Sequence, residues 1–337
     1  MTDAEKPRVV ILNDTSGRSH HGCSRVMRLL VDGLQRHGLQ IIARSPARHD
    51  WVRDAAFLVQ LKQANLIVVN GEGTLHHGRP AGQRLLEVTR HPGARAPVAV
   101  INALWQDNPA DWAAMLGKCA LVSARDSRSQ AAMRAAGVSA RLVPDLSLTG
   151  GAVLQSSPRN GLIVGDSVRL STRRQLARAA ARLNARALLP TKTRQSVLYR
   201  LPLVRAVVSA AYNGVVPCTT PPLMLAADEP AYLAELGRAQ MHLTGRFHAI
   251  CLSIVTQTPF LAVGSNSWKI EALLADAGLP ADRLIPLETL ATLTEAALDR
   301  PFAEAETAGI AAFLTRAMTD AEALFADLAA LAQQDRL

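Results

Sequence analysis

Short apolar runs alternate with longer amphipathic segments along most of this chain. Residues 8–13 (RVVILN) and 66–70 (LIVVN) are almost continuously apolar, which is typical of strands buried on both faces of a parallel sheet. The segment from about residue 22 to 37 instead carries apolar side chains at helical spacing and ends before Gly38. This alternation predicts an α/β fold built on parallel strands.

The rest of the first half keeps the same alternation. Asp126 is expected to cap a helix that runs to residue 136 and ends before Gly137. The other strands of this half are predicted at residues 39–43, 98–102, 121–124 and 141–143, and the other helices at residues 51–62, from Pro80 and from about Pro109.

A second alternating series follows a segment rich in Gly, Ser and Pro at residues 149–160, which is predicted to link two domains. Its strands are predicted at residues 162–165, 187–189, 241–244, 259–263 and 284–286, and its helices at residues 171–183, 231–237, 247–256, from about Trp268, and 301–331. We therefore expect two Rossmann-like parallel-sheet domains facing across a cleft, a GT-B-like α/β fold. The expected domains are residues 1–150 and 151–315. Residues 316–337 form a C-terminal helix, for which packing back across the boundary is one arrangement.

Composition narrows the class of partner. The 37 Lys and Arg against 28 Asp and Glu give a net charge of +9, but this charge is spread out and few aromatic residues accompany it. Nucleic acid is therefore disfavoured as a partner, and anionic substrates or an anionic membrane surface suit the chain better. The four cysteines lie far apart, which predicts no disulfide framework and a reducing cytoplasm.

No stretch resembles a signal sequence or a membrane span, so we expect a cytoplasmic protein that is soluble or at most peripheral to a membrane. Residues 191–213 mix basic and apolar side chains, and two interpretations are open. The segment rests on a membrane and receives a lipid-linked glycan, or it is a core-packing helix with solvated arginines. Pro202 interrupts a long amphipathic face and favours the second interpretation.

Residues 241–274 hold two successive strand-to-helix corners, where open α/β folds bind ligands. Arg246 and His248 lie at the first corner. Ser265, Asn266 and Lys269 lie at the second. Cationic side chains beside a helix N-terminus indicate a phosphate or carboxylate ligand.

Polar residues also follow the strands of the first half. Glu72 lies between two glycines, where the backbone can approach a ligand, and Arg125 follows another strand. A metal site is conceivable where neighbouring strands are followed by His20, His21, Cys23, His76 and His77, but the spacings of these residues match no standard zinc pattern, so no metal is expected. No cofactor is expected either. The candidates for contact with a second substrate are Asp14, His20, His21, His76, His77 and Asp145, although the aspartates can equally cap turns.

Six stretches together resemble the polysaccharide pyruvyl transferase family. They are NDTSGRSHHGC, VVNGEGTLHHG, SARDSRSQAAMRAAGV, LVPDLSL, TGRFHAICLSIVTQTPF and SNSWKIEALL, in this order. The resemblance implies transfer of the enolpyruvyl part of phosphoenolpyruvate to a sugar of a bacterial surface polysaccharide or its precursor, forming a pyruvate ketal. Its arginine-X-histidine donor motif matches Arg246 to His248, and its arginine-aspartate pair matches Arg125 and Asp126. Glu72 stands where the family more usually has glycine.

On this hypothesis His248 and Glu72 are the catalytic acid and base, and the acceptor, a sugar or lipid-linked glycan, contacts the six residues named above. The expected donor-binding residues are Arg246, Arg125, Lys269, Ser265 and Asn266. Two alternatives remain at the level of sequence. One is a glycosyltransferase of GT-B shape that uses a nucleotide sugar, and the other is a non-catalytic glycan-binding or scaffold protein.

Overall fold

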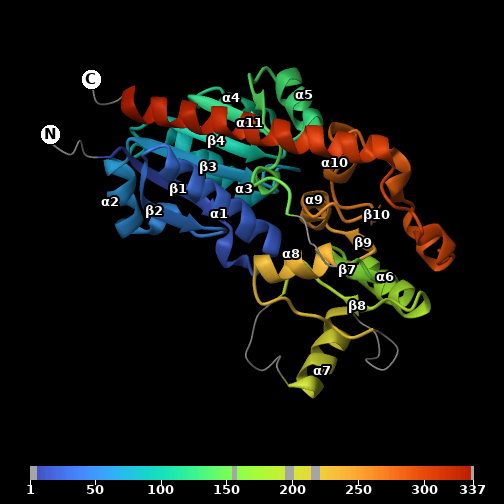
Figure 1. The fold of residues 1–337 in the computed structure, drawn as a ribbon. Coiled ribbons are helices and arrows are strands. Elements are labelled where there is room, and N and C mark those ends of the chain that lie inside the picture. The colour runs from blue at the N-terminus through green and yellow to red at the C-terminus, as the bar shows by residue number, and fades with distance from the viewer. Residues whose placement is uncertain (1–5, 154–157, 194–200, 214–220, 335–337) are drawn as a thin grey trace. The chain divides into compact units, whose positions relative to one another are not determined.

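The computed structural model describes residues 6–153, 158–193, 201–213 and 221–334. The chain divides into two compact units. The first unit contains Met1–Arg18, Val26–Gly150 and Arg316–Leu337, and the second contains Ser19–Arg25 and Gly151–Thr315. The described residues of each unit form a parallel sheet with helices packed on it (Figure 1), so the prediction of two parallel-sheet α/β domains is confirmed.

Among the described residues, the sheet of the first unit has six strands in the order β2-β1-β3-β4-β5-β6. Every strand is parallel to its neighbours. The strands are β1 (Arg8–Asp14), β2 (Gln40–Pro46), β3 (Leu66–Glu72), β4 (Val98–Ala103), β5 (Leu121–Ala124) and β6 (Arg141–Leu142), and the helices are α1 (His21–Arg36), α2 (Ala55–Gln63), α3 (Pro80–Leu86), α4 (Ala110–Leu116) and α5 (Ser127–Ala135).

Successive side chains of β1 enter two different cores, as the alternation along a buried strand requires. Val9 and Ile11 pack with α1 and with the C-terminal part of α11 (Glu304–Gln334). Val10 and Leu12 pack in the cluster that holds Trp51 and Trp112. A continuously apolar strand therefore has apolar neighbours on both faces, which is why such runs predict central strands.

In the part of the chain that the structure describes, the sheet of the second unit has five strands in the order β11-β10-β9-β7-β8. β9 therefore lies between β7 and β10, all parallel. The strands are β7 (Leu162–Ser167), β8 (Ala187–Leu188), β9 (Met241–Gly245), β10 (Phe260–Val263) and β11 (Leu284–Ile285), and the helices are α6 (Leu170–Arg182), α7 (Pro202–Asn213), α8 (Glu229–Gly237), α9 (Phe247–Val255), α10 (Lys269–Asp276) and α11.

Two predicted helices begin at different residues, and a capping aspartate explains each case. The helix predicted over 51–62 is a 3-10 turn at Trp51–Arg53 followed by α2, because the side chain of Asp54 accepts a hydrogen bond from Phe57 N. The helix predicted from Ala231 begins two residues earlier, because Asp228 caps it. Asp126 caps α5 by accepting from Ser129 N, as predicted.

The basic segment predicted at 191–213 is described only in part, because its residues 194–200 lie outside the described residues, as do residues 154–157 of the predicted linker. Helix α7 begins at Pro202, a first-turn position that proline tolerates. Val208 packs on the core of the second unit, whereas Leu203 and Val207 are 77% and 59% exposed. No helix among the described residues has both the length and the apolar character needed to cross a bilayer.

A buried ion pair joins the 3-10 turn before β11 (Ala281–Arg283) to the start of α11 in the second unit. The guanidinium of Arg283, which is fully buried, donates from Nε to Glu306 Oε1 at 2.5 Å and from Nη2 to Oε2 at 2.7 Å. Arg283 also donates to the carbonyls of Phe260 and Pro301. The hydrogen bonds from Arg283 to the carboxylate lower the pKa of Glu306 below its ordinary value.

Replacing one member of this pair leaves the other charge buried and unmatched. We expect Glu306→Gln to lower the free energy of unfolding by about 3 kcal/mol, measured by denaturant titration. Glu304→Gln, on the exposed first turn of the same helix, is the matched control and is expected to change it by less than about 0.5 kcal/mol. Equal effects of the two substitutions would contradict the structural importance of the pair.

Candidate functional site

Two strand ends of the second unit meet because β7 and β9 are neighbours in the sheet. Arg246 follows β9 and is the N-cap residue of α9, and Asp166 lies near the end of β7. Arg246 Nε and Nη2 donate to Asp166 Oδ2 at 2.8 Å and 2.6 Å. The side chain of Arg246 is 13% exposed and that of Asp166 is 2% exposed. The carboxylate thus fixes a guanidinium that still reaches the surface of its unit.

Asp166 was not among the residues predicted from the sequence. Its other oxygen, Oδ1, accepts a hydrogen bond from Thr191 N at 2.9 Å, so it also holds the segment after β8. The polar residue that follows the apolar run at 162–165 was an available signal. Strand order was the missing information, because β8 lies between β7 and β9 in sequence but not in the sheet.

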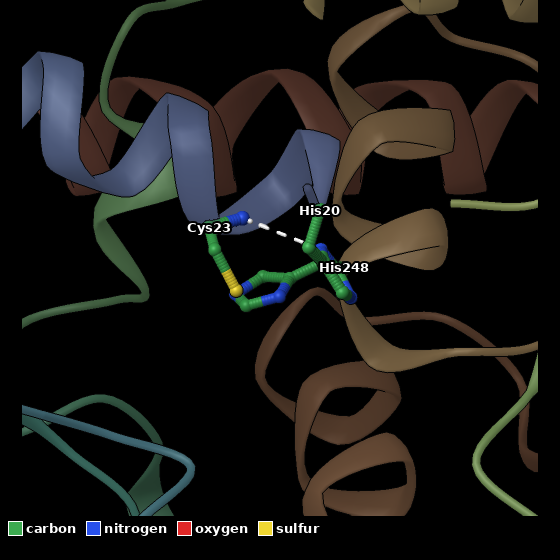
Figure 2. Close-up of side chains that lie close together, drawn as sticks. All are labelled: His20, Cys23 and His248. Carbon is green, nitrogen blue, oxygen red and sulfur yellow. Dashed lines mark hydrogen bonds between the residues drawn. The ribbon is translucent and has the colours of Figure 1, made fainter. Parts of the chain in front are cut away.

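Three buried side chains of the second unit converge beside this corner (Figure 2). His248 comes from the first turn of α9, and His20 and Cys23 come from the beginning of α1. The rings of His20 and His248 lie 5.2 Å apart, nearly edge to face. One side-chain nitrogen of each histidine and the sulfur of Cys23 all lie within 4.8 Å of one another. The predicted acid His248 and the predicted acceptor residue His20 are therefore brought together.

Backbone contacts hold the beginning of α1 in this position. His20 forms an antiparallel bridge with Lys192, and His21 N donates to Thr191 O at 3.0 Å. Gly22 packs directly on His248, since a Cβ at residue 22 would collide with Cβ and Cγ of that histidine. The glycine is thus required for the close approach of α1 to α9.

His21 points to a different place from His20. Its ring stacks on Tyr232 with a centroid distance of 4.8 Å, and the residue is only 4% exposed. Burial lowers the pKa of His21 to about 4, so the ring is neutral near pH 7. The surroundings of His21 therefore explain its conformation without a substrate, whereas it was predicted to contact the acceptor.

The second predicted corner also forms a connected group. Lys269 Nζ donates to Asn266 Oδ1 at 2.6 Å, and Ser265 Oγ donates to the same oxygen at 3.2 Å. All three residues are partly buried and follow β10, the neighbour of β9. The ammonium group and the Arg246 guanidinium thus follow adjacent strands, as the hypothesis of a doubly anionic donor requires.

In the first unit, two residues that were assigned to different substrates form one ion pair. Arg125 Nη1 donates to Asp145 Oδ2 at 3.2 Å, and both side chains are 1% exposed. Asp145 Oδ1 also accepts from the backbone and the hydroxyl of Ser147. Arg125 is therefore an ion-pair partner of Asp145 within the core of its unit. Asp145 caps a turn, which was the alternative to a role in substrate contact.

Glu72 ends β3 in a strained conformation, with φ of 37° and 3% exposure. Asn70 Nδ2 donates to Glu72 Oε2 at 3.3 Å. Asn13 and Asn102, each one residue before the end of a neighbouring strand, also have positive φ, and each donates a hydrogen bond to Asn70. These asparagines were not among the site residues predicted from the sequence, although asparagine after a buried strand tolerates this conformation well. Strained residues of this kind cluster at ligand sites.

The remaining predicted acceptor residues lie in the same unit. Asp14 accepts from Ser16 N at 2.9 Å and lies 3.5 Å from Arg44 Nε. His76 is 1% exposed, whereas the side chain of His77 is 37% exposed and pairs with Asp107 at 3.3 Å. His77 therefore has the most exposed side chain of this group, whereas the side chain of Asp14 is 10% exposed.

A pocket of about 240 Å³ opens at the carboxyl ends of β1, β2 and β3 in the first unit. Its walls include the polar side chains of Asn13, Ser45 and Thr74. Four arginines line it, namely Arg18, Arg48, Arg79 and Arg84. This lining makes the pocket a candidate site for an anion.

Solved structures with the same architecture include several proteins that act on sugars. The chain is similar to S. aureus MnaA, solved with UDP (12% identity, TM-score 0.58, 94% of each chain covered). It is also similar to a putative UDP-N-acetylglucosamine 2-epimerase from Listeria monocytogenes (13%, 0.58, 98% of this chain and 97% of that chain). An O-GlcNAc transferase from Thermobaculum terrenum gives 13% identity and a TM-score of 0.50 over 98% of this chain and 67% of that chain. These similarities define a GT-B-like fold.

The sequence gives the family itself. A search of curated protein sequences found no match. The family model for polysaccharide pyruvyl transferase matches residues 26–267, which is more than half of the chain. The chain therefore belongs to the polysaccharide pyruvyl transferase family, a family of transferases.

A buried histidine beneath the Arg246 corner gives the second unit a measurable pH dependence. His242 in β9 is fully buried; its Nδ1 lies 2.8 Å from Ser253 Oγ, and its Nε2 has no hydrogen-bond partner among the described residues. Burial lowers the pKa of His242 from 6.5 to about 3. Between these values the unfolded chain binds a proton that the folded chain excludes, so stability is complete above pH 6.5 and falls as the pH falls.

As the pH falls from 7 to 4.5, we expect protonation of this histidine in the unfolded chain to lower the free energy of unfolding by about 2–3 kcal/mol. His242→Gln should flatten the pH dependence by that amount, measured by denaturant titration at each pH. His91→Gln is the matched control, and its curve should parallel that of the unsubstituted protein. If the curve of His242→Gln also ran parallel, His242 would have an ordinary pKa in the folded state.

Proposed function

We propose that the chain transfers the pyruvyl group of phosphoenolpyruvate to a sugar of a bacterial surface polysaccharide or its precursor, forming a pyruvate ketal. The observation that carries this proposal is the corner after β9. There Arg246 is fixed by Asp166, and His248 follows two residues later in α9. These residues stand at the family's arginine-X-histidine donor motif.

The donor carries a phosphate and a carboxylate, and two neighbouring corners supply cations for them. Arg246 binds one anionic group through its planar fork of N–H donors. Lys269, oriented by Asn266, binds the other. Ser265 contributes a further hydroxyl, so the four polar side chains form one donor site in the second unit.

The chemistry proceeds by proton transfer and addition. An acid, for which we propose His248, gives a proton to the methylene carbon of phosphoenolpyruvate, and positive charge develops on the adjacent carbon. A sugar hydroxyl attacks that carbon and loses its proton to a base, for which we propose Glu72. The bond from that carbon to the phosphate oxygen breaks. A second sugar hydroxyl then attacks the same carbon and closes the ketal ring, and the departing inorganic phosphate takes its proton.

The donor site predicts a specific defect. Arg246→Lys keeps the positive charge opposite Asp166 but removes the bidentate geometry, so phosphoenolpyruvate should bind about ten- to a hundredfold more weakly in calorimetry. Arg178→Lys, on the exposed face of α6, is the matched control and should bind as the unsubstituted protein does. Thermal unfolding checks that both variants fold.

Two results would count against the donor. One is an unchanged affinity of Arg246→Lys for phosphoenolpyruvate. The other is thermal stabilisation of the protein by a nucleotide sugar and not by phosphoenolpyruvate, which would favour a glycosyltransferase. Release of inorganic phosphate that requires both phosphoenolpyruvate and a glycan acceptor would support pyruvyl transfer.

For the acceptor we propose a glycan that carries phosphate. The support is the pocket of the first unit, in which four arginines surround small polar side chains at three strand ends. A sugar linked to a lipid through phosphate groups has the required negative charge. Asp14 and His77 of the same unit are the proposed contacts to sugar hydroxyls.

Inorganic pyrophosphate serves as the probe of this pocket. Replacing two exposed lining residues together, Arg48→Gln with Arg79→Gln, should weaken its binding by about tenfold or more in calorimetry, because each charge-assisted contact contributes on the order of 1–2 kcal/mol. The control pair, Arg90→Gln with Arg134→Gln, removes the same charge from the exposed surface of the first unit. Equal weakening by both pairs would indicate net charge alone and would refute a phosphate site in the pocket.

A further inference from the structure

The cluster of His20, Cys23 and His248 has the composition of a metal site. One ligand atom from each residue lies within 4.8 Å of the other two, and the three side chains point toward one another (Figure 2). Imidazole nitrogen and thiolate sulfur are the ligands that zinc prefers in proteins. All three residues are less than 9% exposed, so the ligands lie in surroundings that contain little water.

The spacing of the ligands also fits a metal site once the fold is known. His20 immediately precedes α1 and Cys23 lies in its first turn, so the two are three residues apart, a short chelating pair like those of many zinc sites. His248 comes from α9, and this distance along the chain hides it from any search for a local motif. The close packing of Gly22 on His248 brings the third ligand to the pair.

Small shifts of the three side chains are enough to give the distances of a tetrahedral metal site. With metal–nitrogen bonds of about 2.0 Å and a metal–sulfur bond of about 2.3 Å, the two nitrogens and the sulfur of a tetrahedral site lie roughly 3.3–3.5 Å apart. The present separations of up to 4.8 Å require side-chain shifts of about 1 Å, which rotations about the histidine and cysteine side-chain bonds supply.

A hydrogen bond between two of the proposed ligand residues must change. Cys23 N donates a long hydrogen bond of 3.4 Å to His20 Nδ1. A neutral imidazole that gives one nitrogen to a metal carries its proton on the other, so neither ring nitrogen then accepts this bond. The contact is longer than an ordinary hydrogen bond and is therefore inexpensive to lose.

We propose that His20, Cys23 and His248 bind one divalent transition-metal ion, with zinc as the preferred ion. Two imidazoles and one thiolate occupy three positions of a tetrahedron. The fourth position is open to water or to an oxygen of a substrate, as in catalytic zinc sites. The ion would occupy the lone pair of one His248 ring nitrogen, so metal binding and the proton transfer proposed for His248 compete for the same imidazole.

Cobalt is the probe, because a cobalt–thiolate bond gives a charge-transfer absorption band in the near ultraviolet. Full-length protein is treated with a chelator and titrated with Co²⁺ and then with Zn²⁺, in the absence of phosphoenolpyruvate. We expect about one ion per chain, the thiolate band with Co²⁺, and loss of the band on addition of Zn²⁺.

Cys23→Ala should abolish the thiolate band, and His20→Gln should weaken metal binding by about a hundredfold or more, because each removes one of three ligands. Cys251→Ala is the matched control; Cys251 is a buried cysteine of α9 in the same unit and should not affect the band. Circular dichroism verifies the fold of each variant, and His20→Gln keeps the test decisive if Cys23→Ala does not fold.

A titration with no stoichiometric binding at micromolar metal would overturn the proposal, as would a thiolate band that persists in Cys23→Ala. Neither result depends on the proposed donor. Calorimetry with phosphoenolpyruvate on metal-free and metal-loaded protein then tests the donor separately. Metal binding without phosphoenolpyruvate binding would refute the pyruvyl-transfer proposal and leave the metal site standing.

Discussion

The carboxylate of Asp166 is the interaction on which the candidate site of the second unit depends. It accepts from the Arg246 guanidinium through one oxygen and from Thr191 N through the other. The carbonyl of Thr191 in turn accepts from N of His21, the first residue of α1, which lies between His20 and Cys23 in the chain. A single buried charge therefore connects the arginine corner to the histidine and cysteine cluster. Its removal would leave a largely enclosed guanidinium, 13% exposed, without this counter-charge, which is more costly than the loss of a fully exposed surface pair.

Two arginines that sequence analysis selected as anion clamps, Arg246 and Arg125, each lie against a buried aspartate, and the difference between them lies in accessibility. The Arg246 side chain is 13% exposed and Asp166 engages its Nε and one Nη, so the five N–H donors of the fork are not all used by the carboxylate. The Arg125 side chain is 1% exposed. Arg246 thus keeps N–H groups that can donate hydrogen bonds to a ligand, whereas Arg125 stabilises the turn that Asp145 caps.

Much of this molecule was predictable from local patterns. Residues 8–13 and 66–70 are strands because they are apolar on both faces, and Asp126 caps α5 because its side chain reaches Ser129 N. The contact of Asp166 with Arg246 was not predictable, because it requires β7 and β9 to be neighbours although β8 separates them in sequence. The cluster of His20, Cys23 and His248 was missed for the same reason. Its third member, His248, comes from a helix that is far away in the sequence. The spacing of the other histidines and Cys23 along the chain predicted no metal.

The positive backbone angles of the first unit distinguish its strand ends from ordinary turns. Asn13, Glu72 and Asn102 lie at or one residue before the ends of three neighbouring strands, with φ of 64°, 37° and 56°. A left-handed conformation is unfavourable for a residue with a Cβ, although asparagine tolerates it best. If these three positions served only to turn the chain, glycine at each of them would make the protein more stable. Hydrogen bonds from these side chains to Asn70, or from Asn70 to them, offset part of this strain. The network therefore selects amide and carboxylate groups at one edge of the sheet. This is the chemistry that hydrogen-bonds sugar hydroxyls, and it is adjacent to the arginines of the pocket, which Asn13 also lines.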